Sequence, residues 1–332
     1  MKAAFIEQTG PPENIRYDDL PAPRPSDGQV LVKVEAVAVN PIDTYVRGGI
    51  VPMDLPIPFI VGCDLAGVVE ETGPEASRFK VGDRVWASNQ GLLARQGTFA
   101  DYAAVDECWL YPVPDGVNSE DAAAIALVGI TAHLGLFGPA NLTADDTVFV
   151  HGGSGGVGST VVQMAKAVGA AVITTGGSDE KLDACLGLGA DTAINYKEED
   201  VDSRIRESAP AGVNLWWETL REPDFDRVVD LLGPRGRMII MAGREARPVF
   251  PVGAFYIKGC SLFGFAMFNF TPDEQRFSAD QINRWLENGK LKPRIDRVMP
   301  LSETAAAHRL QEDNTIGKAG TLGGKIVLKP DD

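Results

Sequence analysis

The chain has 332 residues, enough for two domains that each bury a core of their own. Its 31 basic and 46 acidic residues give a net charge of −15. Such a surface repels phosphate backbones and anionic lipid, so we expect neither a nucleic acid nor a membrane as a partner. The four cysteines lie far apart without a CxxC pair, which argues against a disulfide framework and a structural zinc site. We see neither a signal peptide nor the roughly 18 consecutive apolar residues of a membrane span, so we expect a cytoplasmic protein.

The first third of the chain is rich in strand and turn signals. Residues 30–39 alternate apolar with mixed positions, as a half-buried strand does. Residues 61–71 are a further strand candidate, and residues 82–87 indicate a turn that leads into a strand. Pro and Gly recur between residues 11 and 58, which disfavours long helices. This part predicts a compact, mainly antiparallel β domain.

From residue 119 onward, strands and helices alternate. Ser119, Glu120 and Asp121 are placed to cap a helix that continues through residues 122–126. The alternation predicts parallel βαβ units. A final strand at residues 324–328 is expected to return to the first domain. The other expected strands are 147–150, 171–175, 192–194, 213–217 and 237–241, and the other expected helices are 157–168, 178–188 and 271–288.

A glycine-rich turn separates the expected strand 147–150 from the helix that follows it. Gly153, Gly155 and Gly158 fit GxGxxG, in which the first glycine permits a tight turn, the second lets backbone approach a pyrophosphate, and the third lets helix pack on strand. The helix N-terminus adds unpaired N–H donors and the positive end of its dipole. Because the motif opens a series of βαβ units, it predicts a dinucleotide site.

The end of the next strand discriminates between NADH and NADPH. An NAD site usually carries Asp or Glu there, about 20 residues on, to bind the ribose diol. Here Gly176, Gly177 and Ser178 stand at that tip, and Lys181 lies one turn into the following helix. A 2′-phosphate would meet no acid at the tip, although two acidic residues follow it and Lys181 is alternatively a solvated helix residue. The pattern favours NADPH.

The glycine loop and four further segments carry a family resemblance over almost the whole length. These segments are residues 40–47 (NPIDTYVR), 62–69 (GCDLAGVV), 79–85 (FKVGDRV) and 97–102 (GTFADY). The chain resembles the medium-chain dehydrogenases/reductases, in their zinc-free, zeta-crystallin-like quinone oxidoreductase branch.

The resemblance implies an α/β protein with two domains. A GroES-like, β-rich catalytic domain would comprise residues 1–122 and 266–332, and a Rossmann NADP-binding domain with a doubly wound parallel sheet would comprise residues 123–265. It also implies an active site in the cleft between these domains. Members commonly dimerise through the edge of the Rossmann sheet, which here falls near residues 259–265.

We do not expect zinc. The alcohol dehydrogenase branch has Cys where this chain has Asn40, and Gly-His-Glu where it has Gly62, Cys63 and Asp64. The clustered cysteines of that branch's structural zinc are absent. Zinc prefers three or four converging ligands, and the three histidines of this chain do not pair at ligand spacing. Cys63 is expected to be a small packed residue.

The resemblance also assigns site residues. Asn40, Tyr45 and Thr131 would line the nicotinamide and substrate pocket and are the catalytic candidates, although Tyr45 is alternatively a packed residue and Thr131 a helix-start cap. The cofactor-binding candidates are Gly153, Ser154, Gly155, Gly156, Val157 and Gly158 around the pyrophosphate; Gly177, Ser178, Lys181 and Tyr196 around the 2′-phosphate; Gly243 and Arg244 in a contact loop; and Phe265 and Met267 along the nicotinamide ribose.

Two segments depart from the family pattern. Residues 214–221 read NLWWETLR, where the family often has an acidic residue and paired glycines. Trp216 and Trp217 are most simply packing residues, and Thr219 or Leu220 would touch the nicotinamide ribose. Residues 263–270 (FGFAMFNF) are unusually aromatic and shape either a hydrophobic substrate pocket or a dimer contact. The sequence leaves these alternatives open.

The expected chemistry is hydride transfer to a conjugated acceptor. Without zinc as a Lewis acid a simple ketone is poorly activated, whereas a quinone or an enone spreads the accepted charge. Tyr45 or Thr131 would hydrogen-bond the acceptor oxygen or relay a proton. The sequence therefore predicts a zinc-independent, NADPH-dependent quinone oxidoreductase. The alternatives are an NADPH-dependent enone or enoyl-thioester C=C reductase and a non-catalytic NADPH-binding structural or regulatory protein.

Overall fold

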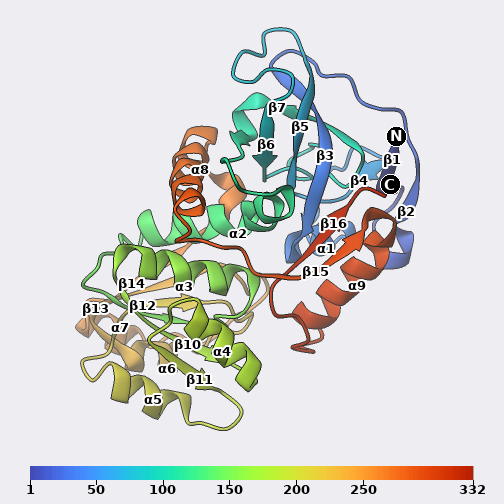
Figure 1. Ribbon diagram of the computed structural model, residues 1–332. Coiled ribbons are helices and arrows are strands. Elements are labelled where there is room, and N and C mark those ends of the chain that lie inside the picture. Colours follow the sequence, from blue (N-terminus) through green and yellow to red (C-terminus); the bar gives the residue numbers. More distant parts are fainter. Residues whose placement is uncertain (332) are drawn as a thin grey trace. The chain divides into compact units, whose positions relative to one another are not determined.

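The computed structural model describes residues 1–331, which divide into two compact units, each traceable in Figure 1. Unit 1 comprises Met1–Ile130, Phe270–Glu287 and Lys292–Asp332. Unit 2 comprises Thr131–Asn269 and Asn288–Leu291. The predicted α/β fold class is confirmed, because unit 1 is β-rich and the sheet of unit 2 is parallel.

Unit 1 is built mainly from antiparallel strands. Its larger sheet has the order β15-β16-β3-β5-β6-β8, with β7 also pairing with β3, and its smaller sheet has the order β2-β1-β4. Strand β16 pairs antiparallel with β3, so the last strand joins the N-terminal sheet as predicted. The strands are β1 (Lys2–Ile6), β2 (Arg16–Asp19), β3 (Gln29–Val39), β4 (Phe59–Ile60), β5 (Leu65–Thr72), β6 (Arg84–Ala87), β7 (Tyr102–Asp106), β8 (Leu110–Pro112), β15 (Ile295–Pro300) and β16 (Lys325–Lys329).

The helices of unit 1 lie between these strands. They are α1 (Pro41–Arg47), α8 (Pro272–Glu287), α9 (Thr304–Thr315) and the short 3₁₀ turns η1 (Pro12–Asn14), η2 (Glu107–Trp109) and η4 (Leu301–Glu303). One prediction needs correction, since residues 61–64 form a turn and the strand expected from residue 61 starts at Leu65. Gly62 explains the turn: its φ is +100°, and a Cβ there would lie 2.0 Å from the Phe99 ring.

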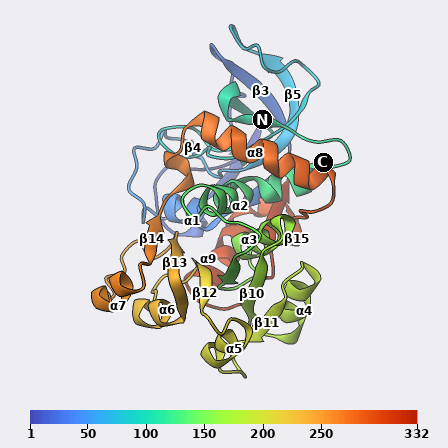
Figure 2. The same cartoon turned by 90° about the vertical axis from the view of Figure 1, so that its left-hand side faces the viewer.

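Unit 2 has a six-stranded parallel sheet with the order β11-β10-β9-β12-β13-β14, which Figure 2 shows with β14 at the left and β11 at the right. The order reverses between β9 and β12, and ligands of such sheets bind beyond the carboxyl ends of the strands at that point. The strands are β9 (Thr147–Val150), β10 (Ala171–Gly176), β11 (Thr192–Asn195), β12 (Val213–Glu218), β13 (Leu232–Ile240) and β14 (Ser261–Gly264). The helices are α3 (Gly156–Val168), α4 (Asp179–Gly187), α5 (Val201–Ser208), α6 (Phe225–Leu231), α7 (Val252–Ile257) and the 3₁₀ turn η3 (Met267–Asn269).

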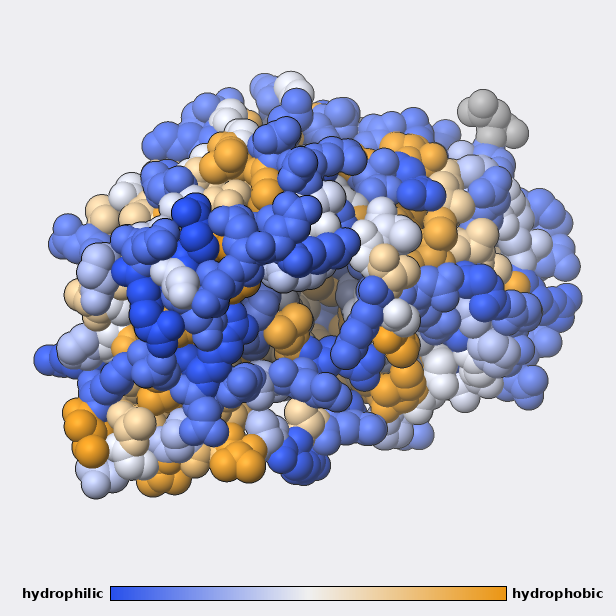
Figure 3. Space-filling model, turned by 90° about the horizontal axis from the view of Figure 1, so that it is seen from below, coloured by the Kyte–Doolittle hydropathy of each residue, from blue (hydrophilic) through white to orange (hydrophobic). Residues whose placement is uncertain are grey.

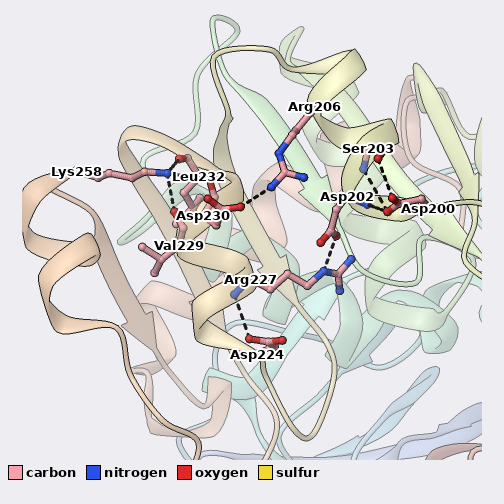
Figure 4. A network of polar contacts seen from close by, with 10 residues as sticks. All are labelled: Asp200, Asp202, Ser203, Arg206, Asp224, Arg227, Val229, Asp230, Leu232 and Lys258. Atoms are coloured by element: carbon pink, nitrogen blue, oxygen red, sulfur yellow. Dashed lines mark hydrogen bonds and ion pairs between the residues drawn. The ribbon is translucent and has the colours of Figure 1, made fainter.

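The core of unit 2 confirms that the paired tryptophans are packing residues. Trp216 and Trp217 are fully buried, and the Trp216 ring centroid lies 4.1 Å from that of Phe149. Outside this core, the Lys258 ammonium donates to the carbonyls of Val229, Asp230 and Leu232 at the end of α6, each at 2.8 Å (Figure 4). A cation at this helix end satisfies carbonyls that have no partner within the helix.

Helix α2 (Ser119–Phe137) is much longer than the sequence indicated. Its cap is Asn118, whose Oδ1 accepts from the Asp121 N–H at 2.7 Å, whereas the Ser119 hydroxyl donates to Glu35. By length and composition α2 would suffice to cross a membrane, which corrects the expectation that no segment would. Most of it is buried inside the protein, as in the core helix of a globular fold.

Candidate cofactor and substrate site

The glycine loop joins β9 to α3 in a tight arrangement. A Cβ at Gly153 would lie 2.2 Å from Thr174 Oγ1 of β10, and a Cβ at Gly158 would lie 2.2 Å from the Gly152 carbonyl oxygen. The left-handed residue of the turn is Gly152, with a φ of +69°, which lies one residue before the first glycine of the motif. Gly153 is therefore required for close packing against β10, and Gly158 for packing of α3 on the loop.

Gly155 differs from these glycines because a Cβ there would meet no close neighbour. The nearest atom to a Cβ there would be the Gly152 carbonyl oxygen, at 3.5 Å. Gly155 is the N-cap of the 13-residue helix α3, and as a glycine it has no side chain with which to cap that end. The N-terminal N–H groups and the dipole of α3 thus suit an anion, and the loop fits a dinucleotide pyrophosphate.

The four residues expected around a 2′-phosphate come together at the end of β10. Ser178 is the N-cap of α4, and the Lys181 Cβ lies 3.3 Å from where a Cβ at Gly176 would be. The Tyr196 hydroxyl would lie 2.3 Å from a Cβ at Gly177, so the half-exposed tyrosine packs directly on this glycine. None of the residues at the tip of β10, which are Gly176, Gly177 and Ser178, is acidic. The four expected residues together therefore fit a ribose that carries a 2′-phosphate.

A buried carboxylate at the end of β12 was not among the predicted site residues. Glu218 accepts from Leu220 N at 2.7 Å and from Trp216 Nε1 at 3.1 Å, and its Oε1 lies 3.2 Å from His151 Nδ1. Burial raises the pKa of Glu218, but His151 and these hydrogen bonds outweigh it and hold the pKa below its usual range. The Thr219 hydroxyl also donates to the His151 carbonyl at 2.9 Å, which ties the loop after β12 to the loop after β9.

The remaining cofactor candidates lie at the ends of β13 and β14. Gly243 has a φ of +84°, and a Cβ there would lie 2.4 Å from the Arg221 carbonyl oxygen; Arg244 beside it is exposed. Phe265 follows β14 with its ring centroid 6.4 Å from that of Trp217, and Met267 is buried. All of the cofactor-binding candidates therefore lie in unit 2.

The catalytic candidates divide between the two units. Asn40 caps α1 and Tyr45 lies half-buried within that helix, both in unit 1. Thr131 is in unit 2 and lies inside α2, so it is not a helix-start cap. Its hydroxyl is buried and has no hydrogen-bond partner within residues 1–331. A buried hydroxyl without a partner is costly, which makes Thr131 a candidate for contact with a ligand.

Asn40 belongs to a buried polar cluster in unit 1 whose other members are Asp43, Cys63, Asp64 and Lys325. Asn40 Nδ2 donates to Asp64 Oδ2 at 2.8 Å, and the Lys325 ammonium donates to Asn40 Oδ1. Cys63 is buried, and its thiol partly offsets the effect of burial on the pKa of Asp43. Burial raises the pKa of Asp43 to about 7, raises that of Asp64 and lowers that of Lys325. The sequence did not indicate that Lys325 belongs to the site, because it showed only a lysine within an apolar strand.

Within residues 1–331, no group of three or more His, Cys, Asp or Glu side chains converges as metal ligands. Cys63 is buried, as expected of a small packed residue.

Known protein families match both the N-terminal and the C-terminal part of this chain. A family model of the alcohol dehydrogenase GroES-like domain matches residues 26–115, and one described as zinc-binding dehydrogenase matches residues 156–283. A quinone oxidoreductase from Sus scrofa is 34% identical, covering 99% of this chain and 98% of its own. A 2-haloacrylate reductase from Burkholderia sp. is 30% identical, covering 99% of each chain.

A solved mycobacterial structure complexed with NADPH is 32% identical and superposes with a TM-score of 0.87, covering 99% of this chain and 100% of that one. The agreement extends over both units and the glycine loop. The chain belongs to the quinone oxidoreductase family of the medium-chain dehydrogenases/reductases.

Proposed function

We propose that this protein is an NADPH-dependent oxidoreductase that reduces quinones. The observation that carries the proposal is the non-acidic tip of β10, where Tyr196 packs on Gly177 beside Ser178 and Lys181. Together with the open face of Gly155, this arrangement suits a dinucleotide with a 2′-phosphate. The mycobacterial neighbour complexed with NADPH and the quinone oxidoreductase relative support the same assignment.

Bound NADPH would supply the hydride, and the protein would bind and orient both reactants. We propose that Tyr45 and Thr131 contact the acceptor, because each offers a hydroxyl that can hydrogen-bond its oxygen or relay the proton that follows the hydride. Asn40 offers no N–H to the acceptor, since its side-chain amide donates to Asp64 and to Ala38. We therefore give Asn40 a positioning role.

A second acceptor class has its own support. The Burkholderia relative is named a 2-haloacrylate reductase, and its name implies reduction of a C=C bond conjugated to a carboxylate. An enone or an enoyl thioester accepts a hydride into a similar conjugated system. Quinones remain our first choice because the more similar relative is a quinone oxidoreductase.

The test is steady-state NADPH oxidation with a panel of quinones, enones and enoyl thioesters, together with the Kd values of NADPH and NADH. We expect turnover with quinones and tighter binding of NADPH. Lys181→Ala should weaken NADPH at least several-fold and leave NADH unchanged, while Lys290→Ala, at an exposed position of unit 2, should change neither. Tight NADPH binding without turnover of any acceptor would indicate the non-catalytic alternative.

The edge of the unit 2 sheet supports a homodimer, which we propose as the assembly. Strand β14 pairs with β13 on one side and, within residues 1–331, with no strand on the other. Helix α7 lies near this strand in Figure 2. Its residues Val252, Tyr256 and Ile257 are exposed. An unpaired edge next to apolar side chains suits a second copy of this chain. The face in Figure 3, by contrast, is largely hydrophilic, with hydrophobic residues in small separate groups.

We further propose zinc-independent catalysis, a cytoplasmic location, and a division into a catalytic domain (1–122 and 266–332) and an NADP-binding domain (123–265). Zinc independence is supported by Asn40 and Cys63 at positions where the alcohol dehydrogenase branch has ligands. Dialysis against a chelator should leave quinone turnover unchanged.

A further inference from the structure

The buried cluster in unit 1 joins three distant segments of the chain. Lys325 is the first residue of β16, Asn40 lies between β3 and α1, and Asp64 immediately precedes β5. Lys325 is 5% exposed, and Asn40 and Asp64 are fully buried. An ammonium and carboxylates without water are costly to bury, and apolar side chains of similar volume often serve stability as well or better. Stability alone therefore does not explain the cluster.

The contacts of Lys325 hold one side chain in a single orientation. Its Nζ donates to the Val39 carbonyl at 2.7 Å and to Asn40 Oδ1, and it lies 3.9 Å from Asp64 Oδ2. An ammonium is only a donor and an ionised carboxylate only an acceptor. The amide oxygen of Asn40 must therefore face Lys325, and its NH₂ must face Asp64.

The orientation of Asn40 bears on the helix that follows. The backbone N–H of Asn40 donates to Asp43 Oδ2 at 2.7 Å, and the Asp43 N–H donates to the Asn40 carbonyl at 3.1 Å. Asn40 is therefore tied to the first turn of α1 by its backbone and to Lys325 and Asp64 by its side chain. Helix α1 has only seven residues, and a helix this short depends on its cap and its tertiary contacts. Tyr45 lies in this helix, on the turn that follows the cap.

We propose that Lys325 is a positioning residue for the acceptor: its ammonium orients Asn40, and Asn40 sets the placement of α1 and of Tyr45. The inference deepens the proposed function and rests on it for the role of Tyr45. Its consequence falls on the acceptor and not on the cofactor, because the cofactor-binding candidates all lie in unit 2.

The decisive variant is the neutral pair Lys325→Met with Asp64→Asn. Lys325→Met alone leaves Asp64 buried without a cation and is expected to lower the Tm or prevent folding. The pair removes both charges and should restore the Tm, but no charge then fixes which end of the Asn40 amide faces residue 64, because the amide of an asparagine both donates and accepts. The matched control is Lys329→Met on the same strand, where the lysine is exposed and pairs with Glu120 at 2.6 Å.

For the neutral pair we expect an unchanged NADPH Kd and a kcat/KM for a naphthoquinone at least tenfold below wild type, since misplacement by about 1 Å commonly costs up to about a hundredfold. Hydrogen exchange of the peptide that contains residues 41–47 should accelerate, while the strands of unit 1 keep their protection. Lys329→Met should match wild type throughout.

Wild-type kinetics together with wild-type exchange of residues 41–47 in the neutral pair would overturn the proposal. A loss of NADPH affinity as large as the loss of kcat/KM would overturn it too, because the effect would then extend to unit 2. If the wild-type protein turns over no quinone, the proposed function fails. The exchange of residues 41–47 then decides alone whether Lys325 holds α1.

Discussion

His308 is expected to weaken this protein in mild acid. The side chain lies on α9, fully buried, with its ring centroid 6.1 Å from that of Phe99, and within residues 1–331 neither ring nitrogen has a hydrogen-bond partner. Burial, with a smaller contribution from the positive charge of Arg47, lowers the pKa of His308 from 6.5 to about 3. The folded protein therefore keeps this imidazole neutral at every pH above about 3.

The sign and size of the effect follow from linkage. Below pH 6.5 the unfolded chain binds a proton at His308 that the folded protein does not bind, so the free energy of unfolding falls as the pH falls. The slope is about 1.4 kcal/mol per pH unit, so the loss between pH 6.5 and pH 5 is about 2 kcal/mol. His308→Leu removes the titration and also two buried nitrogens without partners, so it should not destabilise the protein by loss of hydrogen bonds.

The assay is urea unfolding of wild type and His308→Leu at pH 7 and pH 5. From pH 7 to pH 5, the free energy of unfolding of the variant should rise by about 2 kcal/mol relative to that of wild type. The control is Thr304→Val, a buried and non-titrating substitution on the same helix. Its free energy of unfolding should differ from that of wild type by the same amount at pH 7 and at pH 5. A difference between His308→Leu and wild type that does not change with pH would refute the reasoning.

Three further predictions concern other parts of the molecule. Burial raises the pKa of Asp43 to about 7, so the folded protein loses stability as the pH rises from about 4 towards 7. Over that range the free energy of unfolding of Asp43→Asn, measured in urea, should rise relative to that of wild type by about 1.4 kcal/mol per pH unit. Gly155→Ala should keep the wild-type Tm but lose NADPH affinity at least tenfold by fluorescence titration, whereas Gly158→Ala should lower both; a Gly155→Ala variant that binds normally would contradict the pyrophosphate assignment. Ile257→Asp should shift the protein from dimer to monomer in light scattering, while Leu186→Asp, exposed on α4, should not.

The cofactor end of the site could be predicted from the sequence because its signals are local. The glycine loop, the end of β10 and the start of α4 lie within about 30 consecutive residues, as this kind of βαβ unit does. Where local reasoning failed, a competing contact decided the outcome. Asn118 caps α2 because its side chain reaches Asp121 N. In the glycine loop the positive φ falls on Gly152, while Gly153 packs against Thr174.

The acceptor end could not be predicted to the same depth, because its geometry depends on contacts between distant segments. Asn40 was identified by its place in a family motif, but its saturated amide became visible only when β16 brought Lys325 next to it. Because this contact occupies the side-chain amide of Asn40, we keep the proposal made from the sequence that Tyr45 and Thr131 hydrogen-bond the acceptor. The choice of cofactor and the placement of the acceptor therefore depend on different parts of the chain. The choice of dinucleotide lies in the backbone and side chains of one βαβ segment, whereas the placement of the acceptor depends on a buried charge from the last strand. Neutralising Lys325 together with Asp64 should therefore alter turnover of the acceptor without altering the preference for NADPH.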